Sequence, residues 1–290
     1  MPSHYFIYQM SLSLNCRGTL LNLDQARIMG ILNLTPDSFS DGGEYNSLQK
    51  AIDRVGEMLE EGADIIDIGG YSSRPYADEV RPKEELDRIY PVCESVLKHF
   101  PNILISVDTF RSSVAKEVLE LGVHIINDIS AGNLDSEMMD IIASHENVPY
   151  IMMHMQGTPA NMQTHPSYED ILVNIQDFFV EKLKLAREAG IKDIILDPGF
   201  GFGKSLLHNY QLLYQLDKFQ MFDLPILCGI SRKSMMYKLF DTNPQDVLEV
   251  ATALHLKIPE LGVHIIRVHD IPEAKRIVEL NSYLKGHGII

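Results

Sequence analysis

The sequence predicts an α/β chain folded as a (β/α)8 barrel of the TIM type, preceded by a short β-hairpin. Two observations predict the barrel. After residue 27, short apolar segments rich in Ile, Val and Leu alternate with helix-like segments, as in parallel sheets whose strands are buried on both faces. Several of these segments end abruptly on a polar residue. In a parallel barrel the carboxyl ends of the strands form one mouth, where such side chains can converge on a ligand.

The amino-terminal region is expected to form the hairpin. Residues 5–24 alternate loosely between apolar and polar side chains around Gly18, which suits a small hairpin that closes the bottom of the barrel. We therefore divide the chain into a hairpin extension over residues 1–26 and one barrel domain over residues 27–290, with no domain boundary inside the barrel.

Eight strands and their connecting helices account for the rest of the chain. Between Lys83 and Phe100, and again between Ile171 and Ala186, apolar residues recur with the helical period, and Gly190 follows as a helix stop. The number of repeats favours a closed barrel over an open doubly wound sheet. Strands are expected near residues 28–33, 65–68, 103–107, 123–127, 149–153, 194–197, 226–230 and 263–268.

Composition excludes several classes of protein. The formal net charge of −15 argues against general binding of nucleic acid or of anionic membranes, although a local group of Lys and Arg could still bind a small anion. The residues Cys16, Cys93 and Cys228 are far apart and form no zinc or disulfide pattern. No apolar run reaches the ~20 residues that span a bilayer, and no secretory leader is evident, so we expect a cytoplasmic protein.

Acceptor side chains stand where several strands are expected to end. Asp108, Asn127 and Asp197 supply carboxylates and one amide, which suit a flat heterocycle with an amino-pyrimidinone edge. Met153 either packs against such a ring or fills the core, and His154 is expected to be a structural histidine. At Asp67 the pattern does not separate a buried structural carboxylate from a site residue.

The first two strand-to-helix loops have unusual compositions. Residues 33–43 gather turn formers around one aromatic, Phe39, which is typical of a lid but also of an ordinary polar loop. The second loop begins with Gly69-Gly70, which lets a backbone approach a ligand closely. It also carries Arg74, which either binds an anion or is merely exposed.

Two later loops complete the predicted mouth. Residues 197–205 fail both the phosphate-loop and the dinucleotide fingerprints, and we interpret them as a Gly-rich turn that presents Asp197 and Phe202. After the seventh strand, residues 231–234 open a helix whose free N–H groups, dipole and two cations favour an anion. Arg267 and His269 follow the eighth strand and add positive charge.

With these motifs in view, the chain resembles the dihydropteroate synthase family from about Arg27 to its last helix. The order and spacing of the motifs together make the resemblance highly specific. The matching motifs lie at residues 33–43, 73–75, 107–109, 127–129, 153–157, 197–204, 231–234 and 267–270.

The resemblance implies a homodimeric pterin-binding barrel that uses Mg²⁺. The reaction would join 6-hydroxymethyl-7,8-dihydropterin diphosphate to p-aminobenzoate and release diphosphate. Asn33 resembles the metal ligand of the family. The pterin diphosphate set would be Ser73, Asp108, Asn127, Met153, Asp197, Lys233, Arg267 and His269. The p-aminobenzoate set would be Phe39, Arg74, Pro75, Phe202 and Ser234, next to Ser73, with Asp41, Ser231 and Arg232 in supporting positions.

The chain departs from the family pattern in one loop. Tyr71 stands where many relatives have glutamate, Ser73 where many have threonine, and Tyr76 where glycine is usual. The shape of the p-aminobenzoate pocket and sulfonamide sensitivity therefore stay open. Two alternative functions remain: a pterin-binding methyltransferase domain that passes a methyl group to a corrinoid, which needs no diphosphate site, and a pterin-binding protein without catalysis.

Overall fold

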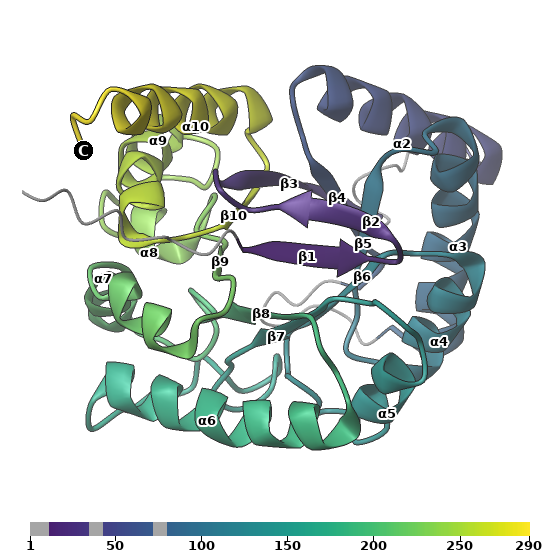
Figure 1. Cartoon of the computed structure of the whole chain (residues 1–290), viewed down its shortest axis with the longest axis horizontal. Coiled ribbons are helices and arrows are strands. Elements are labelled where there is room, and N and C mark those ends of the chain that lie inside the picture. The colour runs from purple at the N-terminus through teal and green to yellow at the C-terminus, as the bar shows by residue number, and fades with distance from the viewer. Residues whose placement is uncertain (1–11, 35–42, 72–79) are drawn as a thin grey trace, which may run out of the picture.

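The predicted barrel is present in the computed structural model, which describes residues 12–34, 43–71 and 80–290 (Figure 1). Eight parallel strands form one sheet in the order β8-β7-β6-β5-β4-β3-β10-β9. A parallel bridge between Leu196 and Ile226 joins its two ends and closes the barrel. The strands are β3 (Arg27–Asn33), β4 (Ile65–Gly69), β5 (Leu104–Asp108), β6 (Ile125–Asp128), β7 (Tyr150–Met153), β8 (Ile194–Asp197), β9 (Leu227–Cys228) and β10 (Ile265–Val268).

Helices surround the strands on the outside of the barrel (Figure 1). Asp170 begins one of them by accepting hydrogen bonds from the backbone N–H groups of Leu172 and Val173, and Gly190 ends it in the left-handed conformation, as predicted. The α-helices are α2 (Gly43–Glu60), α3 (Pro82–His99), α4 (Ser112–Leu121), α5 (Met138–Ala143), α6 (Ile171–Ala189), α7 (Leu206–Leu213), α8 (Ser234–Tyr237), α9 (Leu248–Lys257) and α10 (Ile271–Gly286), and the 3-10 helices are η1 (Leu216–Phe222) and η2 (Pro259–Leu261).

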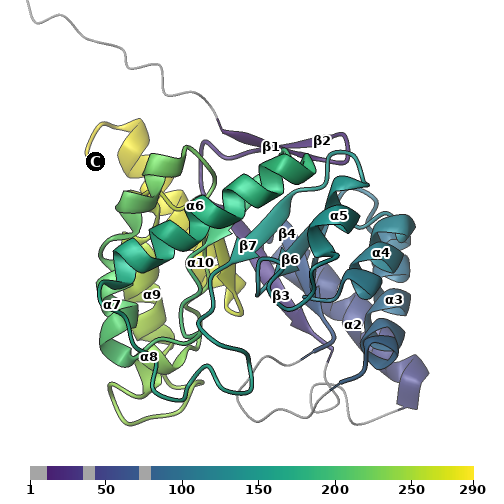
Figure 2. The same cartoon turned by 90° about the horizontal axis from the view of Figure 1, so that it is seen from below.

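The hairpin forms from β1 (Ser13–Cys16) and β2 (Thr19–Asn22) and crosses one end of the barrel (Figure 2). Arg17 and Gly18 both have positive φ, the conformation that a tight two-residue hairpin turn requires. The side chain of Asn15 accepts a hydrogen bond from the Gly18 N–H and holds the turn. The hairpin therefore has a defined local structure of its own.

The hairpin closes the bottom of the barrel with an apolar layer. Each strand contributes one buried side chain to this layer, and four hairpin residues pack against them. The strand residues are Met29, Ile65, Leu104, Ile125, Ile151, Ile195, Leu227 and Ile265, and the hairpin residues are Leu14, Cys16, Leu21 and Leu23. Because successive side chains of a strand face opposite sides, the intervening residues, such as Ile66 and Ile105, pack outward against the helices in a second core.

The strand ends agree with the predicted ones to within a residue or two, and the seventh strand is the shortest. We expected residues 226–230, but β9 contains only Leu227 and Cys228. The backbone turns soon after it, and the Lys233 N–H donates to the Ile230 carbonyl. Among the described residues, no helix combines the length and apolar character needed to cross a membrane.

Candidate active site

The period of two along each strand places the candidate site directly above the apolar bottom layer. Two residues beyond the bottom-layer residue, the next inward side chain is polar on five strands and a methionine on a sixth. These residues are Asp67, Ser106, Asn127, Met153, Asp197 and Arg267. On β3 and β5 the inward column continues to Asn33 and Asp108 at the strand ends. The barrel is thus apolar at the hairpin end and polar at the other.

Arg267 lies at the centre of this polar layer. Its Nε donates to Asp67 Oδ2 at 2.6 Å and its Nη2 donates to Asp108 Oδ2 at 2.8 Å. Asn127 Nδ2 donates to the same Asp67 oxygen at 3.0 Å. Residues from β4, β5, β6 and β10 are therefore joined in one hydrogen-bonded network.

The network has unusual electrostatics. Burial raises the pKa of Asp108 to about 7, although Arg267 opposes the shift and Asp67 adds to it. Burial works against the charge of Arg267, but Asp67 and Asp108 together hold its pKa above the ordinary value. Arg267 therefore stays a cation, and Asp108 changes its charge near neutral pH.

Asn33 lies beside this network, across a glycine. A Cβ placed on Gly69 would lie 3.5 Å from Asp108 Cβ and 3.7 Å from Asn33 Oδ1. The Asn33 amide oxygen and the Asp108 side chain therefore flank Gly69 at the mouth. The absence of a side chain at Gly69 leaves space between them.

The turn after β8 requires its glycines. Gly199 has φ +73° and donates its N–H to Asp197 Oδ1 at 2.7 Å. A Cβ on Gly199 would lie 1.9 Å from the His154 carbonyl oxygen, and one on Gly203 would lie 2.5 Å from that of Gln156. The turn is thus packed against the loop that follows β7, which fixes the direction of Asp197.

A buried lysine holds the same turn from inside. Lys204 Nζ lies 3.0 Å from His154 Nδ1, and it donates to the carbonyls of Gly199 and Phe202 at 2.8 and 3.1 Å. Burial lowers the pKa of both Lys204 and His154. The sequence indicated a structural role for His154, and this contact supports it. The structural role of Lys204 was not recognised from the sequence, because the residues around it were compared only with the phosphate-loop and dinucleotide fingerprints.

Lys233 connects the polar layer to an apolar wall. Its Nζ donates to the Phe200 carbonyl and lies 4.4 Å from the centre of the Phe202 ring. Burial lowers the pKa of Lys233 to about 8, opposed by Asp197. Burial also raises the pKa of Asp197, with Lys233 as the largest opposing influence. The wall includes Ile129, Met153, Met155 and Met162, with Phe110, Leu134 and Phe202 packed against them.

The region after β9 corrects one prediction. We expected residues 231–234 to open a helix whose free N–H groups, dipole and two cations favour an anion, but α8 spans only four residues, and so short a helix has a small dipole. Arg232 forms an ion pair with Asp270 and is partly exposed. Lys233 therefore remains as the cation of this segment that faces the mouth. Ser234 is the first residue of α8.

Ser231 and His269 connect the ends of β9 and β10. Ser231 Oγ lies 3.2 Å from His269 Nδ1, and it also accepts the backbone N–H of His269 at 3.3 Å. The predicted support from Ser231 thus has a geometric basis. The predicted residues Phe39, Asp41, Ser73, Arg74, Pro75 and Tyr76 lie outside the described residues.

Asp67 is the site residue that the sequence did not resolve. It is fully buried in the middle of β4 and contacts two of the predicted site residues. The sequence did contain a signal for Asp67. The two-residue period of a strand makes Asp67 face the inside of the barrel, as Ile65 does. Asp128, which directly follows Asn127, instead points outward and accepts a hydrogen bond from the Tyr150 hydroxyl. A carboxylate that faces the inside of the barrel needs a hydrogen-bond donor from another strand.

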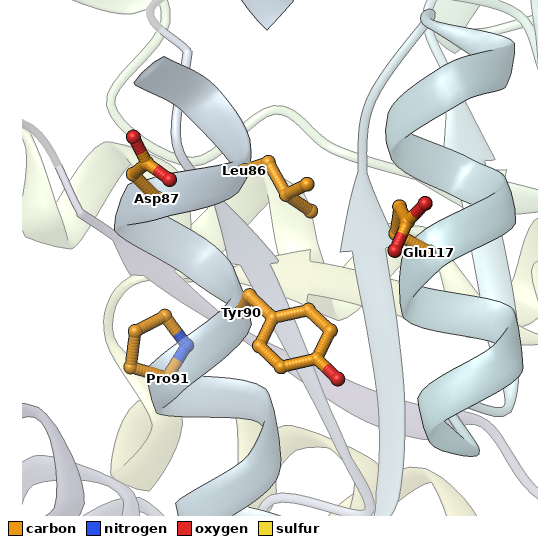
Figure 3. Close-up of a pocket in the computed structure, with 5 residues that line it drawn as sticks. All are labelled: Leu86, Asp87, Tyr90, Pro91 and Glu117. Atoms are coloured by element: carbon orange, nitrogen blue, oxygen red, sulfur yellow. The ribbon is translucent and has the colours of Figure 1, made fainter. Parts of the chain in front are cut away.

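A separate hollow on the outside of the barrel does not involve these residues. It has a volume of about 330 Å³ and lies between α3 and α4, lined by Leu86, Asp87, Tyr90, Pro91 and Glu117 (Figure 3). Its two carboxylates would repel an anion. The mouth, with Arg267 and Lys233, is the better site for a negatively charged ligand.

The described residues contain no group of three or more His, Cys, Asp or Glu side chains arranged to hold a metal ion by themselves. The acceptors Asp108, Asn127 and Asp197 suit a ring with several N–H groups, and the cations suit an anionic tail attached to it.

Comparison with known proteins agrees with this chemistry. Residues 29–269 match the family described as pterin binding enzyme. The dihydropteroate synthase of Escherichia coli K12 is 44% identical over 277 residues, which cover 92% of this chain and 96% of that protein. The Yersinia pestis dihydropteroate synthase, solved in a sulfonamide drug complex, has a TM-score of 0.89 and 42% identity, and the match covers 95% of this chain and 100% of that one. The Xanthomonas albilineans enzyme with 4-aminobenzoic acid has a TM-score of 0.88 and 37% identity, over 95% and 98% of the two chains.

Proposed function

Because the chain belongs to the dihydropteroate synthase family, we infer that the mouth of the barrel is where it carries out the reaction of that family. The chain is a transferase of folate biosynthesis, and it condenses 6-hydroxymethyl-7,8-dihydropterin diphosphate with p-aminobenzoate to give 7,8-dihydropteroate and diphosphate. The observation that carries the location is the network that joins Arg267 to Asp67, Asp108 and Asn127.

The acceptors would bind the pterin ring. Asp108, Asn127 and Asp197 face the inside of the barrel from β5, β6 and β8, and a pterin carries N–H groups along its amino-pyrimidinone edge. Met153, in the apolar wall, would pack against the flat face of the ring. Lys233 would donate to an acceptor on the ring, since its ammonium group lies over the Phe202 ring and interacts electrostatically with Asp197.

The cations would bind the diphosphate. Arg267 keeps its charge because two carboxylates neutralise it, and His269 is positioned by Ser231 at the end of the neighbouring strand. Positive groups that face the departing diphosphate stabilise the negative charge that grows on it. The mouth thus supplies cations for an anionic group in a protein whose formal net charge is −15.

We propose that Mg²⁺ assists, held by Asn33. Magnesium prefers oxygen ligands and usually keeps several waters, so one protein oxygen together with a diphosphate can be enough. The Asn33 amide oxygen lies at the mouth next to Gly69, which fits such a role. When bound there, the ion would neutralise charge on the diphosphate.

The residues of the chain support a dissociative route. The C–O bond to diphosphate breaks and its electron pair leaves with the diphosphate, so a cation remains that is delocalised into the dihydropterin ring. Asp108 and Asp197 would stabilise this cation, and the ring is held flat against Met153. The neutral amine of p-aminobenzoate then attacks the exocyclic carbon and loses a proton, so no strong general base is required.

The p-aminobenzoate pocket is assigned by family resemblance. Phe202 and Ser234 are the described members, and both are adjacent to Lys233 in space or in sequence. The remaining members would be Phe39, Ser73, Arg74 and Pro75, with Asp41 in support. Covering the site with these loops would exclude water, which competes with the amine as a nucleophile.

We also propose a homodimer. Large apolar side chains are exposed on or next to α7, on η1, just after α8 and at the end of α9. Of these, α7, α8 and α9 lie on one side of the barrel (Figure 1). The exposed side chains include Leu207, Tyr214, Met221, Leu239, Phe240 and Leu256. Exposed apolar patches commonly mark interfaces between proteins. Sedimentation of the parent and of a Leu207→Glu, Phe240→Glu variant tests this surface, and equal masses for both would reject it. The cytoplasmic location stays a prediction.

Diphosphate release from the dihydropterin substrate tests the proposed function. We expect release that depends on p-aminobenzoate and on Mg²⁺ and that is abolished by a chelator. Binding of the pterin without any turnover would instead favour the catalytically inactive alternative. Methyl transfer from a folate to a corrinoid, with no diphosphate release, would favour the methyltransferase alternative.

A further inference from the structure

Asp67 has an unequal hydrogen-bonding pattern at the centre of the site. It is fully buried within β4. Its Oδ2 accepts from Arg267 Nε at 2.6 Å and from Asn127 Nδ2 at 3.0 Å, whereas its Oδ1 has no hydrogen-bond partner among the described residues. All of the hydrogen bonding of this carboxylate within the described protein is therefore directed to two other site residues.

The chemistry of a carboxylate dictates how Asn127 is oriented. An ionised carboxylate accepts hydrogen bonds and cannot donate one, so only the amide nitrogen of Asn127 can face it. The amide oxygen of Asn127 is then turned away from Asp67 and is available as an acceptor. If residue 67 were a donor, Asn127 would present its oxygen to that donor and its nitrogen to a ligand.

Asp67 also fixes the plane of the Arg267 guanidinium. One carboxylate would leave the group free to pivot, but Asp67 holds Nε and Asp108 holds Nη2, which defines the plane. The two carboxylates lie on neighbouring strands, with Asp67 paired to Ser106 and Gly69 paired to Asp108 in the ladder. The rigid sheet therefore sets the distance between them.

We propose that Asp67 is a positioning residue that sets the hydrogen-bonding polarity of the pterin site, by keeping the Asn127 amide oxygen free to accept from the ring while orienting Arg267. The proposal rests on the proposed function, in which Asn127 accepts an N–H of the pterin and Arg267 anchors the diphosphate. It adds a residue that does not itself touch the substrate. Its effect on the substrate passes through Asn127 and Arg267.

A double-mutant cycle between Asp67 and Asn127 tests the proposal. Both donors meet on one oxygen, Asp67 Oδ2, so Asp67→Asn can keep its amide oxygen there and is the conservative variant. Asp67→Ala removes the acceptor and leaves the Asn127 amide free to turn. In Asp67→Ala, Asn127→Ala, the amide that Asp67 orients is absent as well.

The measurements are the affinity for 6-hydroxymethyl-7,8-dihydropterin, the melting temperature and the two KM values. We expect Asp67→Ala to weaken pterin binding roughly 10- to 100-fold, Asp67→Asn to bind within about threefold of the parent, and the double variant to lose clearly less than the product of the two single losses. The KM for the pterin diphosphate should rise in Asp67→Ala while the KM for p-aminobenzoate stays within about twofold. A residue that served only stability would change the melting temperature without this selective effect, and the two single losses would multiply in the double variant.

Asn127→Ala separates failure of the proposal from failure of the assigned function. If Asn127→Ala binds the pterin as the parent does, the assignment of Asn127 is wrong. If Asn127→Ala loses affinity but Asp67→Ala does not, the proposal for Asp67 is overturned. Should Asp67→Ala fail to fold, Asp67→Leu, which fills the same space without an acceptor, is measured in its place: a selective loss of pterin affinity supports the proposal, and parental affinity overturns it.

Discussion

Arg267 and Asp108 form an ion pair inside the barrel, with Nη2 2.8 Å from Oδ2, although two further strands, β3 and β4, separate β10 from β5 in the sheet. The pair makes Asp108 the most informative titrating group of the site. Burial pushes the pKa of this carboxyl upward to about 7 even though the guanidinium pulls it down. Its charge therefore changes within the pH range where the enzyme can be assayed.

Pterin binding should depend on pH through Asp108. The ionised carboxylate accepts N–H groups of the ring, whereas its protonated form meets them with a competing donor. We expect affinity for the dihydropterin to fall about tenfold for each pH unit below the pKa of about 7. Titration calorimetry between about pH 5.5 and 7.5 measures this dependence. Asp108→Asn should bind weakly and without the dependence, and a parent with constant affinity would contradict the prediction.

Stability should change in the opposite direction over the same range. The folded pKa of Asp108 is raised above its ordinary value of 3.8, so the native state holds a proton that the unfolded chain has already released. The stability that Asp108 contributes is therefore greatest at low pH and falls as pH rises from about 4 to about 7. Asp108→Asn should raise the melting temperature more at pH 7.5 than at pH 5. An equal change at both would contradict the raised pKa.

Lys233 should matter for turnover more than an exposed lysine does. Its pKa is lowered to about 8 by burial, so the side chain is still mainly charged at neutral pH. Replacement by Met removes a charge-assisted hydrogen bond to the pterin and should cost at least about 1.5 kcal/mol, or roughly tenfold in kcat/KM. Lys184→Met on the exposed face of α6 is the matched control. Equal kcat/KM for Lys233→Met and the parent would remove Lys233 from the site.

The architecture could be predicted from the sequence because it is repeated locally. The strands are short apolar runs, most of them rich in Ile, Val or Leu, and the segments 83–100 and 171–186 show the helical period, so several independent signals agreed. The ends of the strands then located Asn33, Asp108, Asn127 and Asp197 at one mouth. These features can be recognised from a few residues of the chain at a time. The closed sheet adds only that the strand ends meet at one mouth.

The contacts between distant strands could not be predicted in the same way. The pairing of Asp67 with Arg267 joins residues 200 positions apart, and it depends on the register of the closed sheet. The four-residue length of α8 and the ion pair of Arg232 with Asp270 likewise depend on how the chain turns after β9. Local patterns carry no information about these partners, although the inward orientation of Asp67 could have been derived from the two-residue period of its strand.

Lys204 should be important for stability and should affect catalysis indirectly. Its ammonium group donates to the carbonyls of Gly199 and Phe202 and contacts His154, and Met in its place would leave these buried acceptors without a donor. We expect Lys204→Met to lower the free energy of unfolding by about 3 kcal/mol, measured by urea denaturation. Lys218→Met, an exposed change on η1, should change it little. A similar small effect for Lys204→Met would show that the turn after β8 holds without the lysine.

Asn33→Ala should selectively weaken the effect of Mg²⁺ on diphosphate binding. The Asn33 amide oxygen is at the mouth beside Gly69, and it is the protein oxygen that we assign to the metal. In the parent we expect Mg²⁺ to increase the affinity for inorganic diphosphate, and in Asn33→Ala this increase should be smaller by roughly tenfold. Affinity for the dihydropterin without diphosphate should be unchanged, because that ligand does not need the metal. Calorimetry with and without Mg²⁺ separates the two effects, and Asn174→Ala on the exposed side of α6 controls for loss of an asparagine. An identical response to Mg²⁺ in Asn33→Ala and the parent would move the metal to another ligand, since a true ligand cannot be removed without changing the affinity for the ion.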